Sequence, residues 1–251
     1  MAATVVVTAS EGSFPGLAKA LKGSRVEVRH DPLIGFAEPR DWGGVDQALR
    51  RLSSYAAVAL TSPRAAAAVA GRLHQLDDKS APPARPPVWA SGAATARALG
   101  DVLGPVLVPG ERKAGDGAAA TLALAMLAAK VAGRVLFLCG ETHREELPDL
   151  LRGGGIEVDE VICYRSVLAT EAAAQAASTH GTLVIVGSPA VADLLARACP
   201  PHARPDLLAV GPTTATAARA SGWPPVAVAA EPTAEAVAAA VRNVLGTRPS
   251  H

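Results

Sequence analysis

The sequence predicts an α/β fold made of two similar halves, each with a parallel sheet covered by helices on both faces. Three observations support this. Short apolar, β-branched runs alternate with helix-like segments along almost the whole chain, which is the pattern of successive βα units. A strand-like run ending in Ser-Pro occurs twice, at 58–63 and 183–189. Each copy is followed by a second strand-like run and a Gly-x-x-Thr-Ala segment, at 92–96 and 211–215.

Composition narrows the class of protein. The 251 residues are 49% hydrophobic but only 3% aromatic, so alanine, valine and leucine must fill the cores of two small domains. A net charge of +1 argues against a nucleic-acid partner bound through a broad basic face. The three cysteines have no close spacing, which is typical of a reduced, cytoplasmic chain. The N-terminus lacks a basic segment and its apolar run has the length of a strand, so we expect no signal peptide. The longest apolar stretch is too short to cross a bilayer, so we expect no membrane partner.

In the first half, β-branched and apolar runs predict strands, and the segments between them predict helices. The strands are expected at residues 4–8, 26–29, 57–60, 88–90 and 106–108. Helices are expected at 12–21, at 45–52, at 63–73 and from Gly92 onwards. Loops are expected at 80–87 and 109–117, and an alanine-rich helix follows the second loop and runs to about residue 131. The segment 30–39 contains Pro32, Gly35 and Pro39 and is predicted to be an extended connector.

The second half repeats this order. A strand at 135–139 is followed by a turn at 140–144 and by a helix after Pro148 that ends in a glycine run at 153–155. The extended segment 161–168 is the expected partner of the first connector. Further strands are expected at 183–186, 207–210 and 226–229, with helices between them and a last helix from Thr233. Because α/β proteins bind ligands outside the carboxyl ends of their strands, the residues that follow the strands are the candidate binding residues.

Both repeated segments place a helix N-terminus directly after a strand. The serine of Ser-Pro can cap an orphan N–H group, and a proline at the first helical position sacrifices no hydrogen bond. Gly-x-x-Thr lets the backbone turn sharply and points free N–H groups outward. These N–H groups and the helix dipole together attract anions. We therefore expect the two halves to face one anionic ligand.

Several short motifs follow one another along the chain in a specific order and spacing. They are Thr61-Ser62-Pro63-Arg64-Ala65, Gly92-Ala93-Ala94-Thr95-Ala96, Cys139-Gly140 with Arg144-Glu145-Glu146-Leu147-Pro148, Tyr164 with its neighbours, Ser188-Pro189, Gly211-Pro212-Thr213-Thr214-Ala215, Gly222 with Pro224, and Ala230-Glu231-Pro232-Thr233. Each is weak by itself, but as a set they resemble the uroporphyrinogen-III synthase family over nearly the whole chain. Two positions depart from the family pattern, Ser91 in place of an apolar residue and Gly187 in place of a hydroxyl residue.

The resemblance implies two similar doubly wound parallel-sheet domains joined by a two-stranded connector. Carried onto this chain, residues 1–35 and 167–251 form one discontinuous α/β domain, and residues 36–166 form an inserted α/β domain. The connectors are expected near 31–39 and 162–168. These bounds agree with the extended segments that the residues alone predict.

The resemblance also implies an activity, the cyclisation of the linear tetrapyrrole hydroxymethylbilane to uroporphyrinogen III, with inversion of ring D and loss of water, in porphyrin and heme biosynthesis. The enzyme would be a cofactor-independent carbon–oxygen lyase, cytoplasmic and monomeric, that acts by orientation and general acid assistance and has no metal, nucleic-acid or membrane partner. One alternative is a non-catalytic tetrapyrrole- or anion-binding sensory module on the same fold, although no output domain is expected beyond the last helix. A phosphosugar binder or isomerase is another, but no motif places the base that it needs.

The resemblance further implies roles for individual residues. Tyr164 is the expected proton or hydrogen-bond donor to the departing hydroxyl, since phenols are protonated at neutral pH. The expected substrate-binding residues, which would hold carboxylates, are Ser62, Arg64, Thr95, Arg144, Ser188, Thr213 and Thr214. The competing interpretations are packing for the tyrosine, helix capping for the serines and threonines, and solvated surface for the arginines. We expect His143 to be a surface histidine and Thr233 to be a helix N-cap.

Overall fold

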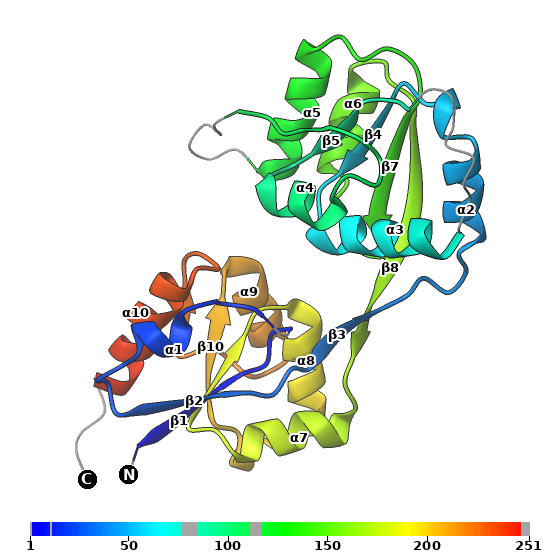
Figure 1. Cartoon of the computed structure of the whole chain (residues 1–251). Helices are drawn as coiled ribbons and strands as arrows, with labels where there is room; N and C mark the ends of the chain where they lie inside the picture. Colours follow the sequence, from blue (N-terminus) through cyan, green and yellow to red (C-terminus); the bar gives the residue numbers. More distant parts are fainter. Residues whose placement is uncertain (1, 11, 77–84, 111–116, 247–251) are drawn as a thin grey trace. The chain divides into compact units, whose positions relative to one another are not determined.

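The chain divides into two compact units, which are described separately. The computed structural model describes residues 2–10, 12–76, 85–110 and 117–246, so the loops predicted at 80–87 and 109–117 lie largely outside the described residues (Figure 1). Unit 1 consists of Met1–Gly35 and Val167–His251, and unit 2 of Phe36–Ser166. The chain leaves unit 1 in strand β3 (Ile34–Ala37) and returns to it in strand β8 (Val158–Leu168).

Unit 1 is built on a five-stranded sheet with the order β11-β10-β9-β1-β2. The strands are β1 (Ala3–Val7), β2 (Val26–His30), β9 (Leu183–Val186), β10 (Asp206–Val210) and β11 (Ala227–Ala229). Neighbouring strands pair in parallel. The chain runs outward from β1 to β2 and then, on the other side of β1, from β9 to β11. The winding therefore reverses between β1 and β9.

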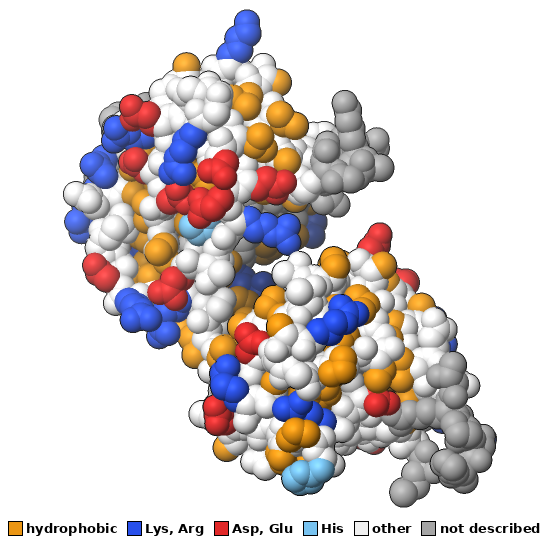
Figure 2. Space-filling model, turned by 180° about the vertical axis from the view of Figure 1, so that it is seen from behind, with side chains coloured by type: hydrophobic (Ala, Val, Ile, Leu, Met, Phe, Trp, Pro, Cys, Tyr) orange, Lys and Arg blue, Asp and Glu red, His pale blue; other side chains and the backbone are white. Residues whose placement is uncertain are grey.

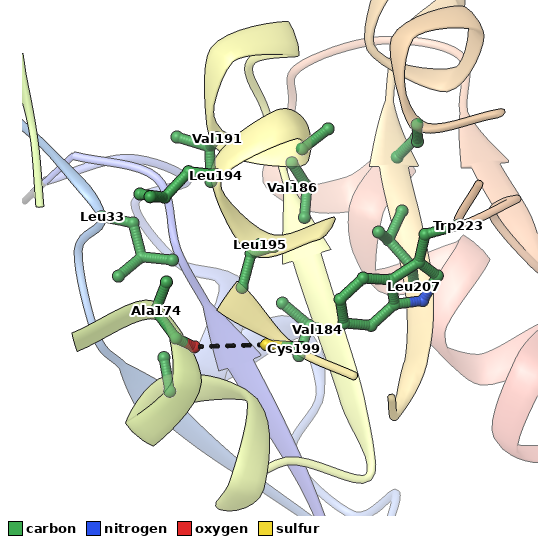
Figure 3. Packing of buried hydrophobic residues seen from close by; sticks show 14 of the residues in the cluster. Leu33, Ala174, Val184, Val186, Val191, Leu194, Leu195, Cys199, Leu207 and Trp223 are labelled. Carbon is green, nitrogen blue, oxygen red and sulfur yellow. Dashed lines mark hydrogen bonds between the residues drawn. The ribbon is translucent and has the colours of Figure 1, made fainter. Parts of the chain in front are cut away.

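Helices cover both faces of this sheet (Figure 1). They are α1 (Leu17–Ala20), α7 (Glu171–Thr179), α8 (Pro189–Ala198), α9 (Pro212–Ala220) and α10 (Ala234–Gly246). Successive side chains of β9 point to opposite faces of the sheet, as the two-residue period of a strand requires. Val184 packs with α7, α8, α9 and Trp223 in one core (Figure 3). Ile185 packs with α1 and α10 in the other.

Unit 2 contains a six-stranded sheet with the order β3-β8-β7-β4-β5-β6. Besides β3 and β8, the strands are β4 (Ala57–Leu60), β5 (Val88–Ala90), β6 (Val106–Leu107) and β7 (Val135–Gly140). From β8 to β6 the neighbours are parallel. The chain runs outward from β4 to β6 and then from β7 to β8 on the other side, so the winding reverses between β4 and β7.

The helices of unit 2 also lie on both faces of its sheet. They are α2 (Gly43–Arg50), α3 (Pro63–Leu76) and α4 (Ala93–Leu99) on one face, and α5 (Ala118–Ala128) and α6 (Glu146–Gly153) on the other. Because both faces are covered, every residue of the central strand β7 is buried, which explains why it reads as a continuous apolar run. Among the described residues, no helix is long and apolar enough to span a membrane.

The predicted fold class is confirmed: the strands pair in parallel from β11 to β2 and from β8 to β6, and both sheets are doubly wound and enclosed by helices. The helix expected at 12–21 is wrong in extent, since only α1 forms. Gly12 and Gly16 take positive φ angles of 77° and 91°, and Pro15 has no N–H group to donate. The helix expected after Pro148 already begins at Glu146, because proline is tolerated in the first helical turn.

The capping predictions have mixed outcomes. Ser62 Oγ accepts a hydrogen bond from the N–H of Arg64 at 3.2 Å, and Thr233 Oγ1 accepts one from the N–H of Ala236 at 3.2 Å; both are caps as expected. The cap expected at Ser188 is wrong, because within the described residues its side chain makes no capping hydrogen bond. Proline at the first position of α8 still starts that helix.

Candidate functional site

The candidate site of unit 2 lies where the winding of its sheet reverses. After β4 the chain turns into α3 on one face, and after β7 it turns toward α6 on the other. Such diverging connections leave a crevice outside the carboxyl ends of the two strands. A cavity of about 230 Å³ lies here. The polar and aromatic residues that line it are Thr61, Ser62, Thr142, His143, Arg144, Glu146 and Tyr164.

Strand β8 carries Tyr164 to this crevice. Tyr164 is paired with Gly140 at the end of β7, just after a register irregularity at Cys139, and the N–H of Glu141 donates to the Tyr164 carbonyl at 2.9 Å. A Cβ atom added to Gly140 would lie 2.5 Å from Cζ and 2.8 Å from the hydroxyl oxygen of Tyr164. The phenol therefore lies directly against the bare backbone of Gly140, and a side chain at this position would displace it.

Two side chains contact Tyr164, and a third packs on one of them. The Tyr164 hydroxyl donates to Ser62 Oγ at 3.4 Å, which is long for a bond between two hydroxyl groups. The Phe36 ring meets it edge-on, with centroids 5.8 Å apart, and the Arg64 guanidinium lies 3.7 Å from the centroid of Phe36. The Tyr164 hydroxyl is therefore only weakly hydrogen-bonded to Ser62.

A second, larger cavity of about 480 Å³ lies beside β3, α2 and α3. Phe36, Trp42, Arg64 and Tyr164 are among the residues that line it. Its walls combine aromatic rings with a guanidinium group, which suits a planar, negatively charged ligand. Tyr164 lines both cavities, whereas Arg64 faces the larger one and Arg144 the smaller one.

His143 is not the surface histidine that was expected. Its side chain is 17% exposed, and its ring meets Phe137 edge-on at 5.5 Å. Nδ1 lies 2.9 Å from the carbonyl oxygen of Gly140, and Nε2 lies 2.6 Å from Glu160 Oε2. The other oxygen of Glu160 accepts from Arg152 at 2.5 Å. His143 thus joins the turn after β7 to strand β8.

The carboxyl group of Glu160 is stabilised in its charged form. Partial burial acts to raise its pKa, but hydrogen bonds from Arg152 and His143 outweigh burial and hold the pKa below its ordinary value. In the described part of the chain, ligand atoms of His143, Glu145 and Glu160 lie within 4.8 Å of one another, as a metal site would require. The 2.6 Å separation of Nε2 and Oε2, however, is that of a direct hydrogen bond, so His143, Glu160 and Arg152 form a hydrogen-bonded network.

The remaining predicted residues are placed differently. Thr95 follows β5 and Thr214 follows β10, each as the third residue of its helix, and both residues are only 3% exposed. Thr213 is exposed beside Thr214. Ser188 is half-buried after β9, where the winding of unit 1 reverses. The structure thus gathers Ser62, Arg144 and Tyr164 around one cavity and places Ser188, Thr213 and Thr214 in unit 1.

Sequence reasoning missed the supporting residues Gly140, His143 and Glu160. The role of Gly140 could have been predicted from the sequence, because a glycine that ends a buried strand often marks a close approach of another group. No sequence pattern predicts the pairing of His143 with Glu160, since this pairing depends on the register between β7 and β8.

The fold and the site define a two-domain, doubly wound α/β protein whose polar side chains gather at the carboxyl ends of its strands. The family model described as uroporphyrinogen-III synthase HemD matches residues 16–239. The chain therefore belongs to the uroporphyrinogen-III synthase family.

Solved structures agree with this assignment at the level of the fold. A mutant uroporphyrinogen III synthase from the extremely thermophilic bacterium Thermus thermophilus is 16% identical with a TM-score of 0.58, over 98% of this chain and 100% of that one. Uroporphyrinogen-III synthetase from Helicobacter pylori is 18% identical with a TM-score of 0.61, over the same shares of the two chains. No curated protein sequence matches the chain significantly.

Proposed function

We propose that this protein cyclises hydroxymethylbilane to uroporphyrinogen III, with inversion of ring D and loss of water. The observation that carries the proposal is the placement of Tyr164 between Gly140 and Ser62, beside the cavity at the reversal point of unit 2, in a chain that belongs to the uroporphyrinogen-III synthase family.

Tyr164 is the proposed general acid. Its hydroxyl gives a proton to the departing hydroxyl group, the carbon–oxygen bond breaks, and water leaves behind an azafulvene cation. The substituted carbon of ring D attacks this cation and forms a spiro intermediate. The spiro intermediate then fragments and recloses with ring D inverted. The proton that ring D loses at the end restores the phenol. The sum is the loss of one water, with no oxidation or reduction, so we propose a cofactor-independent lyase.

Arg64 and Arg144 are proposed to bind substrate carboxylates as planar forks. Ser62 and Ser188 would add hydroxyl contacts, and Thr213 would bind through its exposed hydroxyl or its N–H group. The burial of Thr95 and Thr214 favours a different role for these two residues. They would hold the helix N-termini whose neighbouring N–H groups face the ligand.

Compartment and oligomeric state are also proposals. Three buried, free cysteines support a reducing, cytoplasmic location. Acidic and basic side chains are interspersed on the face shown in Figure 2, which supports a small-molecule substrate over a nucleic acid. We expect a monomer of 25.3 kDa, which light scattering after gel filtration would measure; twice that mass would contradict this expectation.

The decisive experiment is the isomer ratio formed from freshly generated hydroxymethylbilane. Uncatalysed closure gives the symmetric type-I macrocycle, so an excess of type III measures ring-D inversion directly. We expect type III to dominate when the protein is added. Folded protein that leaves the type-I product unchanged, but binds a linear tetrapyrrole, would favour the non-catalytic sensory module instead.

A further inference from the structure

We infer that His143 is a positioning residue, which holds the turn between β7 and α6 so that Tyr164 and Arg144 keep their places beside the cavity. The inference rests on the proposed function for the role of Tyr164. Its structural part, the rigidity of residues 140–145, stands independently of that function.

His143 fastens this turn at two points. Its Nδ1 is bonded to the carbonyl oxygen of Gly140, 2.9 Å away at the start of the turn. Its Nε2 is bonded to Glu160 on β8, the strand that also carries Tyr164. Arg152 of α6 holds the same carboxylate from the other side. One imidazole therefore links the turn, the adjacent strand and the following helix.

The two bonds of His143 have partners of the same kind. Nδ1 lies against a backbone carbonyl oxygen and Nε2 against a carboxylate oxygen, and both types of oxygen accept hydrogen bonds. The charged groups around His143 are the carboxylates of Glu160 and of Glu145, whose Oε1 lies 3.6 Å from Nε2, and Arg152 beyond Glu160. Phe137 covers one side of the ring without adding charge.

The turn matters because each end of it touches the candidate site. Gly140 is the surface against which the phenol lies, and the N–H of Glu141 holds the Tyr164 carbonyl. Arg144 directly follows His143 and lines the same cavity. A displacement of a reacting group by about 1 Å can lower a rate about a hundredfold. Loosening the turn should therefore reduce turnover although His143 itself need not touch the substrate.

The test compares His143→Gln with His74→Gln, an exposed histidine of α3 in the same unit. Glutamine has a single side-chain nitrogen atom, so it cannot reproduce bonds from two nitrogen atoms on opposite sides of a rigid ring. We expect kcat for type-III product to fall about ten- to hundredfold with a smaller change in KM. We also expect faster amide hydrogen exchange in residues 140–145. His74→Gln should match the unchanged protein in both measurements.

Glu160 supplies a second pair of variants. Glu160→Gln keeps an oxygen that accepts from Nε2, so it should retain more activity than Glu160→Ala. His143 and Glu160 hold the turn through one shared hydrogen bond, and we call this pair the clamp. The double variant His143→Gln with Glu160→Ala should therefore lose little more activity than either single variant.

The outcomes separate the two proposals. Unchanged protein that makes no type-III product overturns the proposed function, and hydrogen exchange still tests the clamp by itself. Normal type-III production with wild-type kcat in His143→Gln overturns the positioning role. Unaltered exchange at 140–145 in that variant, or fully additive losses in the double variant, does the same.

Discussion

At the scale of single residues, the site depends on a close contact between a glycine and a tyrosine. Gly140 does not have a positive φ angle, so its requirement is not conformational. It arises because the Tyr164 ring occupies the space of a Cβ atom. The sequence motif Cys139-Gly140 and the motif around Tyr164 are therefore two halves of one feature.

Gly140→Ala should displace Tyr164, because the new methyl group would lie 2.5 Å from Cζ of the phenol. We expect a loss of about ten- to hundredfold in kcat with the fold retained, measured by type-III formation and circular dichroism. Gly153→Ala is the control, since an added Cβ there meets nothing within 4 Å. An equal response in both variants would show that the contact with Tyr164 has no special role.

Tyr164→Phe isolates the hydroxyl from the ring. The edge-on contact with Phe36 remains possible, and only the proton and the 3.4 Å bond to Ser62 are removed. Loss of a general acid typically lowers a rate by about 10²–10⁴-fold, and we expect a fall in kcat within that range. A variant with full activity would assign Tyr164 to packing, and another proton donor would then be needed.

At the scale of elements, half-buried arginines join helix ends and helix pairs. Arg204 donates to the carbonyl oxygens of Cys199 at 3.0 Å, Ala196 at 2.8 Å and Gly222 at 2.7 Å, and its guanidinium lies 4.9 Å from the Trp223 ring centroid. The residue thereby satisfies carbonyls at the ends of α8 and α9, where a cation is also favoured by the helix dipole.

Arg204→Ala should destabilise unit 1, because it leaves these carbonyls without their charged donor. Hydrogen bonds to a charged group are worth about 1.5–3 kcal/mol, so we expect the free energy of unfolding to fall by about 2 kcal/mol. Urea unfolding followed by circular dichroism measures this. Arg197→Ala, at an exposed ion pair of 3.6 Å, should change little; a similar loss in both variants would contradict the structural role of Arg204.

Asp46 and Arg72 form a two-point ion pair between α2 and α3, with bonds of 2.8 and 2.6 Å. The hydrogen bond from Arg72 is the main cause that lowers the pKa of Asp46 below its ordinary value. The resulting stability is complete above the unfolded pKa of about 3.9 and is lost as the pH falls through the lower native pKa.

Asp46→Asn should therefore lower the melting temperature at pH 7, and the difference from the unchanged protein should shrink as the pH is lowered below about 4. Thermal unfolding at several pH values measures this difference. Asp101→Asn, at an exposed position, is the control and should show little effect at any pH. A difference for Asp46→Asn that stays constant with pH would mean that the ion pair contributes no net stability.

At the scale of the whole molecule, two doubly wound units each provide a reversal point where polar residues gather. In unit 2 this point holds Ser62 and Tyr164 beside a cavity. In unit 1 it holds Ser188 and the buried Thr8, whose hydroxyl donates to the Ile185 carbonyl at 2.8 Å. The topology thus repeats the reversal of winding in both units, in keeping with the duplicated Ser-Pro and Gly-x-x-Thr segments.

The sequence by itself determined the order of strands and helices, the family of the protein and the choice of Tyr164 as the candidate acid. The order of strands and helices depends on residues close together in the chain, through the periods of strands and helices and through caps such as Thr233. The family and the choice of Tyr164 follow from the resemblance of the short motifs to those of the uroporphyrinogen-III synthase family. Only the tertiary structure decided what surrounds Tyr164. Strand order and register bring it against Gly140 and Ser62, the latter 102 positions away. They also bury His143 against Glu160 and turn Thr95 and Thr214 into the cores. Local patterns carry no information about such contacts, because the same sequence period is compatible with more than one order of strands.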